Sequence, residues 1–242
     1  MWNKDENKII VNLIRHGKTL LNEKHCYLGK TDAPLSSLGV SEIKERASKN
    51  IYPKCNYVFV SPLIRTAQTA SIIYPGIEQI VINDFSEMDF GSFEGKNYDE
   101  LKENKYYRRW IDEQRNEEKS VVDLLYSDLE DPLSVGIILP ENKENFVHRN
   151  AAGFIEAIKR YEHEKQAHSI TKDEINVISI VAHGGTIMSL LNAYTKKDYY
   201  SGMCSCGEGF ATEVTYTVDN YGNIKISCLS VIDRICIGSD NR

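Results

Sequence analysis

The run Asn176–Ala182 (NVISIVA) is short, rich in β-branched residues and apolar at almost every position. A strand with one solvated face alternates apolar and polar residues, so a run without alternation indicates a strand that is covered on both faces. Helices cover both faces of a sheet when the sheet is largely parallel. This run therefore favours an α/β sheet between two helical layers.

The rest of the chain follows the same plan. Five more segments have the length and composition of strands: Ile9–Ile14, Tyr57–Val60, Gln79–Ile82, Ala211–Val218 and Ile224–Val231. Helical patterns lie between them at Ser36–Ser48, Arg65–Ile73, Asn145–Glu164 and Thr186–Tyr194. With 242 residues, we predict one three-layer α/β/α domain over residues 1–242, with a central, mostly parallel sheet.

The stretch from about residue 96 to 140 interrupts the alternation. Tyr98–Asn116 is predicted to be a polar and aromatic helix, and a charged run with a proline follows it. We expect a helical insertion over one edge of the sheet and over the active site, not a second domain. Its segment Tyr106–Trp110 either lines a lid or forms a solvated helix with one packed aromatic stripe.

The overall charge restricts the partners. The net charge is −6, from 29 basic and 35 acidic residues, so no basic face for nucleic acid is expected. No apolar run approaches the ~20 residues that a membrane span needs, and the first residues, MWNKDENK, have no apolar core of a signal peptide. The six cysteines lack Cys-x-x-Cys spacing, which favours reduced thiols and a cytoplasmic location. Cys204 and Cys206 would be half of a metal site at best.

Two histidines follow two of the predicted strands directly. Arg15–Gly17 comes after the first strand, and His183–Gly185 comes after the most apolar one. The carboxyl ends of parallel strands meet at one edge of a sheet, where ligands bind in α/β folds, so both histidines and Arg15 are expected to converge. A helix that starts after each glycine would present free backbone N–H groups to an anion.

Further residues of the right type follow other strands. Arg65 comes after the strand Tyr57–Val60, and a pair of guanidinium groups beside a histidine is typical of a phosphate clamp. Transfer of a phosphoryl group from an alcohol also needs a proton donor. Glu87, Asp89 and Glu94 qualify by type, and Asp89 is expected to be a turn residue.

Five ordered segments resemble the motifs of the histidine phosphatase superfamily, also named the phosphoglycerate-mutase-like superfamily. Arg15–Asn22 resembles R-H-G-x-T-x-x-N, and Gly29–Gly39 resembles G-x-x-D-x-P-L-[ST]-x-x-G. Ser61–Ala70 is similar to S-x-L-x-R-[AT]-x-[QE]-T-A, Glu87–Gly95 to E-x-x-[FY]-G-x-[WF]-E-G, and Val181–Gly185 to the second histidine motif. Glu141, Phe146 and Arg149 fit the spacing of G-E-S-x-x-x-F-x-x-R without its flanking glycine and serine.

The resemblance implies a mechanism. His16 would attack phosphorus and form a phosphohistidine, with its other ring nitrogen donating to a backbone carbonyl, for which Gly17 is a candidate. Glu87 would protonate the departing alcohol and then activate water. The phosphoryl oxygens would be held by Arg15, Asn22, Arg65, His183 and the Gly184 backbone. Because these groups neutralise the phosphate, no metal or cofactor is implied.

Residues 88–95 differ from the corresponding segment of the family's mutases and follow its phosphatase form. The segment His183–Leu190 and the residues after it resemble the α-ribazole phosphatase-like and broad-specificity phosphatases. The expected function is therefore hydrolysis of a small phosphorylated metabolite, by a monomer or a homodimer. The alternative is a cofactor-dependent phosphoglycerate mutase-type phosphotransferase. A catalytically inactive binding module is disfavoured, because such proteins usually lose one of the core residues.

Overall fold

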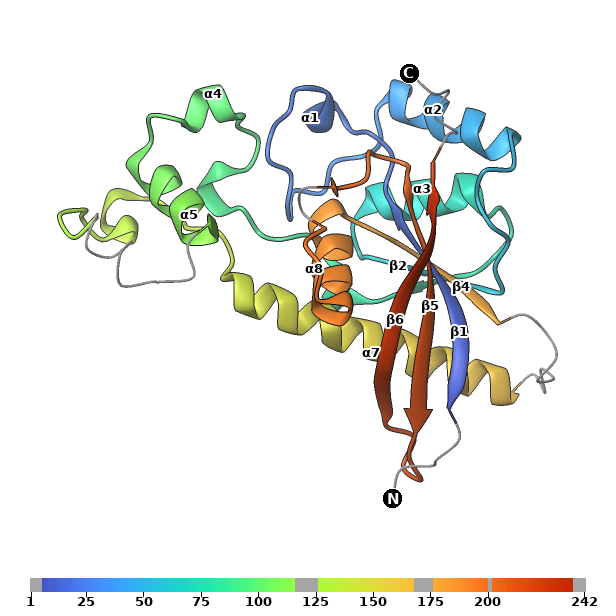
Figure 1. Ribbon diagram of the computed structural model, residues 1–242. Coiled ribbons are helices and arrows are strands. Elements are labelled where there is room, and N and C mark those ends of the chain that lie inside the picture. The colour runs from blue at the N-terminus through green and yellow to red at the C-terminus, as the bar shows by residue number, and fades with distance from the viewer. Residues whose placement is uncertain (1–5, 116–125, 168–175, 200–201, 237–242) are drawn as a thin grey trace.

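The computed structural model describes residues 6–115, 126–167, 176–199 and 202–236 of the chain (Figure 1). Its centre is one six-stranded sheet in the order β3-β2-β4-β1-β5-β6. The strands are β1 (Asn7–Arg15), β2 (Tyr57–Val60), β3 (Gln79–Val81), β4 (Val177–Ala182), β5 (Gly209–Val218) and β6 (Ile224–Ile235). The pairings among β1 to β4 are parallel, whereas β5 runs antiparallel to β1 and β6 antiparallel to β5. The predicted α/β fold is confirmed, and the antiparallel β5–β6 pair makes the sheet mixed.

Helices cover both faces of this sheet. The long helix α7 (Lys143–Ala167) and α8 (Gly184–Thr195) pack on one face, where Phe154 and Leu191 join strand residues such as Ile180 in one core cluster. On the other face, Ile43 of α2 (Ser37–Ser48) and Ala70 of α3 (Ile64–Ile73) pack against Val181. Neighbouring residues of β4 thus enter different cores, and that is why its sequence does not alternate.

The predicted helices differ from the observed ones in the insertion and at their ends; α7 (Lys143–Ala167), for example, extends beyond both ends of the predicted Asn145–Glu164. The stretch 98–116 forms α4 (Tyr98–Leu101) and α5 (Lys105–Arg115), with Asn116 outside the described residues. The predicted helix is divided in two because the side-chain oxygen of Asn104 accepts the backbone N–H groups of Tyr106 and Tyr107. Asn104 thereby caps the start of a new helix, α5. Helix α8 begins at Gly184, two residues before the predicted start, with His183 as its N-cap.

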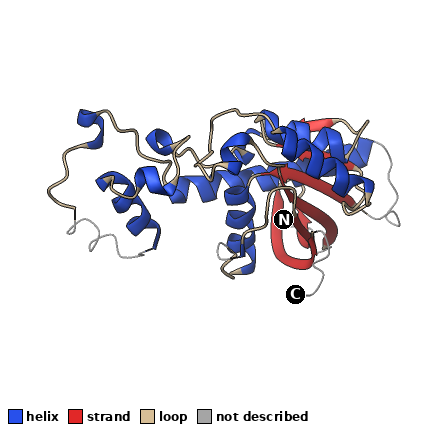
Figure 2. Ribbon diagram, turned by 90° about the horizontal axis from the view of Figure 1, so that it is seen from above, coloured by secondary structure: helices blue, strands red, loops and turns tan. Residues whose placement is uncertain are grey.

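The described part of the insertion stands at one side of the sheet (Figures 1 and 2). It also includes the short 3₁₀ helix η3 (Pro132–Val135). Tyr107 and Trp110 of α5 are buried with Phe93 and Phe146, and Tyr27 packs against this cluster. The aromatic cluster therefore attaches the insertion to the loop that follows Glu87.

The remaining short helices lie in the loops near the carboxyl ends of the strands. They are α1 (Leu20–Glu23), η1 (Asn83–Phe85) and η2 (Gly91–Phe93). Among the described helices, none has the length and apolarity needed to cross a bilayer.

Candidate active site

The parallel pairing of β1 with β4 places the two histidines side by side. Arg15, the last residue of β1, pairs with Ala182, the last residue of β4, so His16 and His183 leave the sheet at the same edge. Their ring centroids are 5.2 Å apart, and the side chains are 3% and 0% exposed. The convergence expected from the sequence is therefore present.

The ring of His16 is held in one tautomer. Its Nδ1 atom lies 2.7 Å from the carbonyl oxygen of Gly17. Because a carbonyl oxygen can only accept a hydrogen bond, Nδ1 carries the proton and Nε2 keeps its lone pair. Burial, and then the charges of Arg65 and Arg15, lower the pKa of His16 well below its ordinary value. His16 is thus a neutral imidazole with Nε2 as its basic atom.

The ring of His183 has the opposite tautomer. Its Nε2 atom lies 2.7 Å from the hydroxyl of Ser61, and its Nδ1 atom lies 3.3 Å from Nε of Arg65. Since Nε–H of an arginine can only donate, Nδ1 accepts and Nε2–H donates to Ser61. Burial, followed by the charge of Arg65, lowers the pKa of His183 well below its ordinary value. The sequence assigned no role to Ser61, although it belongs to the motif that contains Arg65.

Arg65 lies inside the protein, although its place at a helix start is also typical of surface residues. Its side chain is fully buried, with Nη1 donating to the carbonyl of Thr31 at 2.9 Å and Nη2 to that of Gly29 at 2.7 Å. Burial lowers the pKa of Arg65 to about 10, so it remains a cation at neutral pH. The turn at residues 29–31 therefore orients the guanidinium beside the histidines.

Glu94 organises that turn. Its Oε1 accepts the backbone N–H groups of Lys30 at 2.8 Å and Phe90 at 3.2 Å. Its Oε2 accepts the N–H of Thr31 at 2.8 Å and the Thr31 hydroxyl. A carboxylate with four donors is unsuited to proton transfer, which removes Glu94 from the candidate acids. Asp89 is a turn residue as expected, because it accepts the N–H of Gly91 at 2.8 Å.

We predict that Glu94→Gln weakens substrate binding more than it slows turnover. Hydrogen bonds to a charged group contribute about 1.5–3 kcal/mol each, so the loosened turn should raise KM for a phosphomonoester about tenfold. Steady-state kinetics check this, with Asp99→Asn as the control because Asp99 has only an exposed ion pair with Lys102. An unchanged KM would show that Arg65 keeps its place without Glu94.

Arg15 brings unused donors to the same place. Its Nη1 donates to the carbonyl of Cys204 at 2.8 Å, while its buried Nε has no hydrogen-bond partner among the described residues. A Cβ atom on Gly184 would lie 3.2 Å from Cζ of Arg15, so the guanidinium lies against the N-terminus of α8. A buried, unpaired cationic donor beside a helix N-terminus favours an anion.

Glu87 occupies the same helix N-terminus. Its carboxylate accepts the N–H of Met88 and the N–H of Gly185, each at 2.9 Å. Burial raises the pKa of Glu87 above its ordinary value, although the two N–H groups oppose the shift. A Cβ atom on Gly185 would lie 2.5 Å from the carboxylate, so the second glycine leaves the space that Glu87 fills.

Asn22 belongs to α1 and uses its side-chain oxygen to cap that helix. Its side-chain oxygen accepts the N–H and the hydroxyl of Thr19, at 3.1 and 3.0 Å, as part of a capping box. The oxygen is thereby used within the protein, and the Nδ2 hydrogens are left as donors. Gly184 is the first residue of α8, next to the N–H that Glu87 occupies.

Two aromatic side chains of α5 are packed inside the insertion, which favours the packed aromatic stripe over an open lid. Tyr107 and Trp110 are 3% and 9% exposed, and the hydroxyl of Tyr107 is hydrogen-bonded to that of Tyr27 at 2.8 Å. A cavity of about 630 Å³ between α5 and the start of α7 is lined by residues such as Trp110, Leu139 and Val147, and neither His16 nor His183 is among its lining residues. The candidate active site is therefore the histidine pair, where the ionisable groups converge.

All six cysteines are free. Within the ranges that the structure describes, no group of three or more His, Cys, Asp or Glu side chains is placed to hold a metal ion.

Known proteins share both the sequence pattern and the fold. The chain is 25% identical over 181 residues to "Putative phosphoserine phosphatase 2" of Hydrogenobacter thermophilus, which covers 74% of this chain and 75% of that protein. It is 33% identical over 109 residues to the 2,3-bisphosphoglycerate-dependent phosphoglycerate mutase of Rhizobium rhizogenes, and this match covers 42% of this chain and 49% of that protein. The α-ribazole phosphatase of Shigella flexneri superposes with a TM-score of 0.62 at 18% identity, over 96% of this chain and all of that one. The sequence profile of the histidine phosphatase superfamily (branch 1) matches residues 11–203, and this chain belongs to that family.

Proposed function

We propose that this protein is a metal-independent phosphomonoesterase that hydrolyses a small phosphorylated metabolite through a phosphohistidine on His16. The observation that carries the proposal is the state of His16, a buried neutral imidazole that lies near two arginines and whose Nε2 has no hydrogen-bond partner among the described residues. A neutral imidazole nitrogen is a nucleophile, and fixed cations stabilise the charge of a phosphoryl group in transfer.

In the first step, Nε2 of His16 attacks phosphorus and the bond from phosphorus to the leaving oxygen breaks. Glu87 gives its proton to that oxygen, which requires the protonated acid that burial favours. The equatorial oxygens are held by Arg15, Arg65, Asn22, His183 and the Gly184 N–H. Before substrate binds, His183 is neutral, with Nδ1 accepting from Arg65 and Nε2 donating to Ser61. To hold a phosphoryl oxygen, Nδ1 takes up a proton from solvent, which the phosphoryl dianion favours, and then donates to that oxygen instead of accepting from Arg65.

In the second step, water attacks the phosphohistidine. Glu87, now a carboxylate, takes a proton from the water, the bond from Nε2 to phosphorus breaks, and inorganic phosphate leaves. The site returns to its starting protonation. Two arginines supply the positive charge that a metal ion supplies in other phosphatases, which supports metal independence.

The acceptor of the phosphoryl group separates a phosphatase from a mutase. Residues 88–95 follow the phosphatase form, and the phosphatase-named relative aligns over more of the chain than the mutase does. These two observations favour water as the acceptor. The name of that relative makes phosphoserine one substrate to test.

We expect the purified protein to release inorganic phosphate from 4-nitrophenyl phosphate at a rate that EDTA does not change. A panel of small phosphomonoesters, phosphoserine among them, then ranks the leaving alcohols. Rapid interconversion of 2- and 3-phosphoglycerate with little phosphate release would contradict the proposal and favour the mutase. No activity on the panel, with phosphopeptide binding retained, would favour the binding module.

A further inference from the structure

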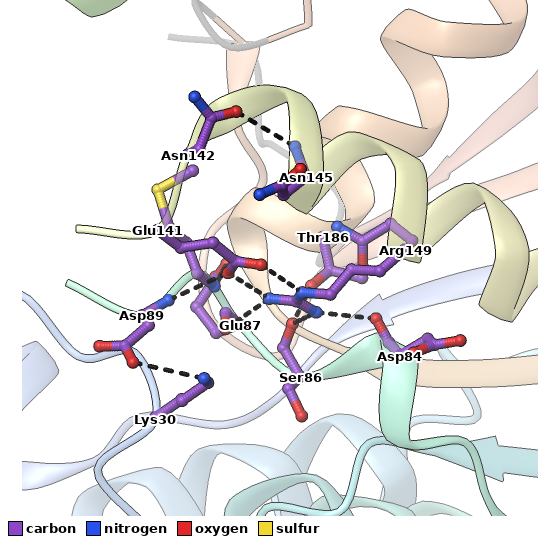
Figure 3. A network of polar contacts seen from close by, with 12 residues as sticks. Lys30, Asp84, Ser86, Glu87, Asp89, Glu141, Asn142, Asn145, Arg149 and Thr186 are labelled. Carbon is purple, nitrogen blue, oxygen red and sulfur yellow. Dashed lines mark hydrogen bonds and ion pairs between the residues drawn. The ribbon is translucent and has the colours of Figure 1, made fainter. Parts of the chain in front are cut away.

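Behind Glu87 lies a polar network centred on Arg149 of α7 (Figure 3). Its Nε and Nη2 donate to the two carboxylate oxygens of Glu141, each at 2.7 Å. Its other three hydrogens reach backbone carbonyls: those of Asp84 at 2.8 Å, Ser86 at 2.6 Å and Glu87 at 3.0 Å. A guanidinium has five N–H donors, and all of them are used here.

The three carbonyls belong to the segment that determines where the Glu87 carboxylate lies. Only the one-turn helix η1 (Asn83–Phe85) gives this segment regular structure. The hydroxyl of Thr186 in α8 approaches the carbonyls of Phe85 and Ser86 at 3.4 Å, which is a long contact. Arg149 makes shorter bonds to the same segment, including one to Glu87 itself.

Glu141 extends the network to the other side of Glu87. Its backbone N–H donates to the carbonyl of Asp89 at 2.7 Å, and its Oε2 lies 3.4 Å from the N–H of Asp89. The two side chains of the ion pair are only 21% and 16% exposed. Although burial alone would raise it, the hydrogen bonds and charge of Arg149 lower the pKa of Glu141 below its ordinary value. Arg149 and Glu141 therefore fix the backbone before and after Glu87.

We propose that Arg149, held by Glu141, is the positioning residue for Glu87 as proton donor. Arg149 acts through the backbone of residues 84–87 and holds the acid where it meets the leaving oxygen. The inference rests on the proposed phosphatase function. It implies that Arg149 controls protonation of the leaving group, whereas its hydrogen bonds reach none of the residues proposed to hold the phosphoryl oxygens.

The leaving group provides the readout. An alkyl alcohol is a poor leaving group and needs the proton of Glu87, whereas 4-nitrophenolate leaves with little help. The values of kcat/KM for glycerol 2-phosphate and for 4-nitrophenyl phosphate report the phosphorylation step. In Arg149→Lys, which keeps the charge beside Glu141 but cannot reach every carbonyl, the ratio of the alkyl to the aryl value should fall at least ~10-fold. The inhibition constant of inorganic phosphate should be the same for Arg149→Lys and the unmodified protein, because the residues proposed to bind phosphate are unchanged.

Arg160→Lys is the matched control, because Arg160 lies on the same helix and has only a half-exposed ion pair with Glu156. The double variant Arg149→Met with Glu141→Gln leaves no charge unpaired and repeats the test if the single variant fails to fold. An equal fall for both substrates, or no fall for either, would overturn the positioning role. Absence of phosphate release by the unmodified protein would instead overturn the proposed function before any variant is compared.

Discussion

Replacement of His16 by alanine is expected to abolish phosphate release while the protein remains folded. No other described group offers an unprotonated nitrogen in the same place, because Nδ1 of His183 already accepts from Arg65. Loss of a nucleophile that forms a covalent intermediate lowers kcat on the order of 10⁴-fold or more. Phosphate release from 4-nitrophenyl phosphate measures the loss, and circular dichroism checks the fold.

The phosphoenzyme gives a second, independent measurement. Wild-type protein quenched during turnover should carry an acid-labile phosphate on His16, and the His16→Ala protein should carry none. His148→Ala is the control, because His148 is 77% exposed on α7 and should keep full activity and a labelled His16. A near-wild-type rate in His16→Ala would end the assignment of this residue as the nucleophile.

The strand-end residues could be predicted because a general rule of topology applies to them. The apolar run of β4 indicates parallel neighbours, and the carboxyl ends of parallel neighbours meet, so the sequence alone predicts that His16 and His183 lie together. The antiparallel direction of β6 relative to β5 can also be predicted from the sequence. Only five residues separate Val218 from Ile224, too few for the crossover that a parallel pair needs.

The carbonyl of Gly17 was a candidate partner of His16, and the two atoms are in contact. The supports of Arg65 and Glu87 could not be predicted, because their partners are backbone atoms of distant segments. Arg65 bonds to the carbonyls of residues 29 and 31, and Arg149 to those of residues 84, 86 and 87. Every residue has a carbonyl, so no pattern of side chains marks these positions. By residue type Glu87 and Glu94 were equal candidates, and only the family resemblance selected Glu87. Their hydrogen bonds agree with that selection, with two N–H donors for Glu87 and four donors for Glu94.

The helix boundaries likewise depend on contacts that the sequence pattern does not reveal. Asn104 divides the predicted helix of the insertion by capping α5 with its side chain, although asparagine is also tolerated inside helices. The helix after His183 was predicted to begin at Thr186, whereas Gly184 and Gly185 already belong to the first turn of α8. Tertiary packing requires glycine at both positions, because a Cβ atom on either one would lie within 3.3 Å of a side-chain atom of Met203, Arg15 or Glu87.

Replacement of Glu87 by glutamine is expected to slow alkyl phosphates far more than aryl phosphates. An amide cannot donate the proton, so kcat/KM for glycerol 2-phosphate should fall on the order of 10²- to 10⁴-fold. The amide also keeps only one oxygen for the N–H groups of Met88 and Gly185, and we expect a modest loss of stability. Parallel assays with 4-nitrophenyl phosphate, which needs less proton donation, separate the chemical effect from that loss.

The dependence of the rate on pH provides a second test of Glu87 as the proton donor. Turnover of an alkyl phosphate requires neutral His16, which is lost as pH falls through a pKa that burial, Arg65 and Arg15 have lowered. It also requires protonated Glu87, which is lost as pH rises through a pKa that burial has raised. The lowered pKa of His16 extends activity to lower pH, and the raised pKa of Glu87 extends it to higher pH. The wild-type profile should therefore be bell-shaped with an acidic optimum. The residual activity of the Glu87→Gln protein, assayed on the same alkyl phosphate, should lose the decline on the alkaline side and keep the acidic one. The ionisation of the substrate is the same for both proteins, so an alkaline decline that survives in the variant would assign the proton donor to another residue.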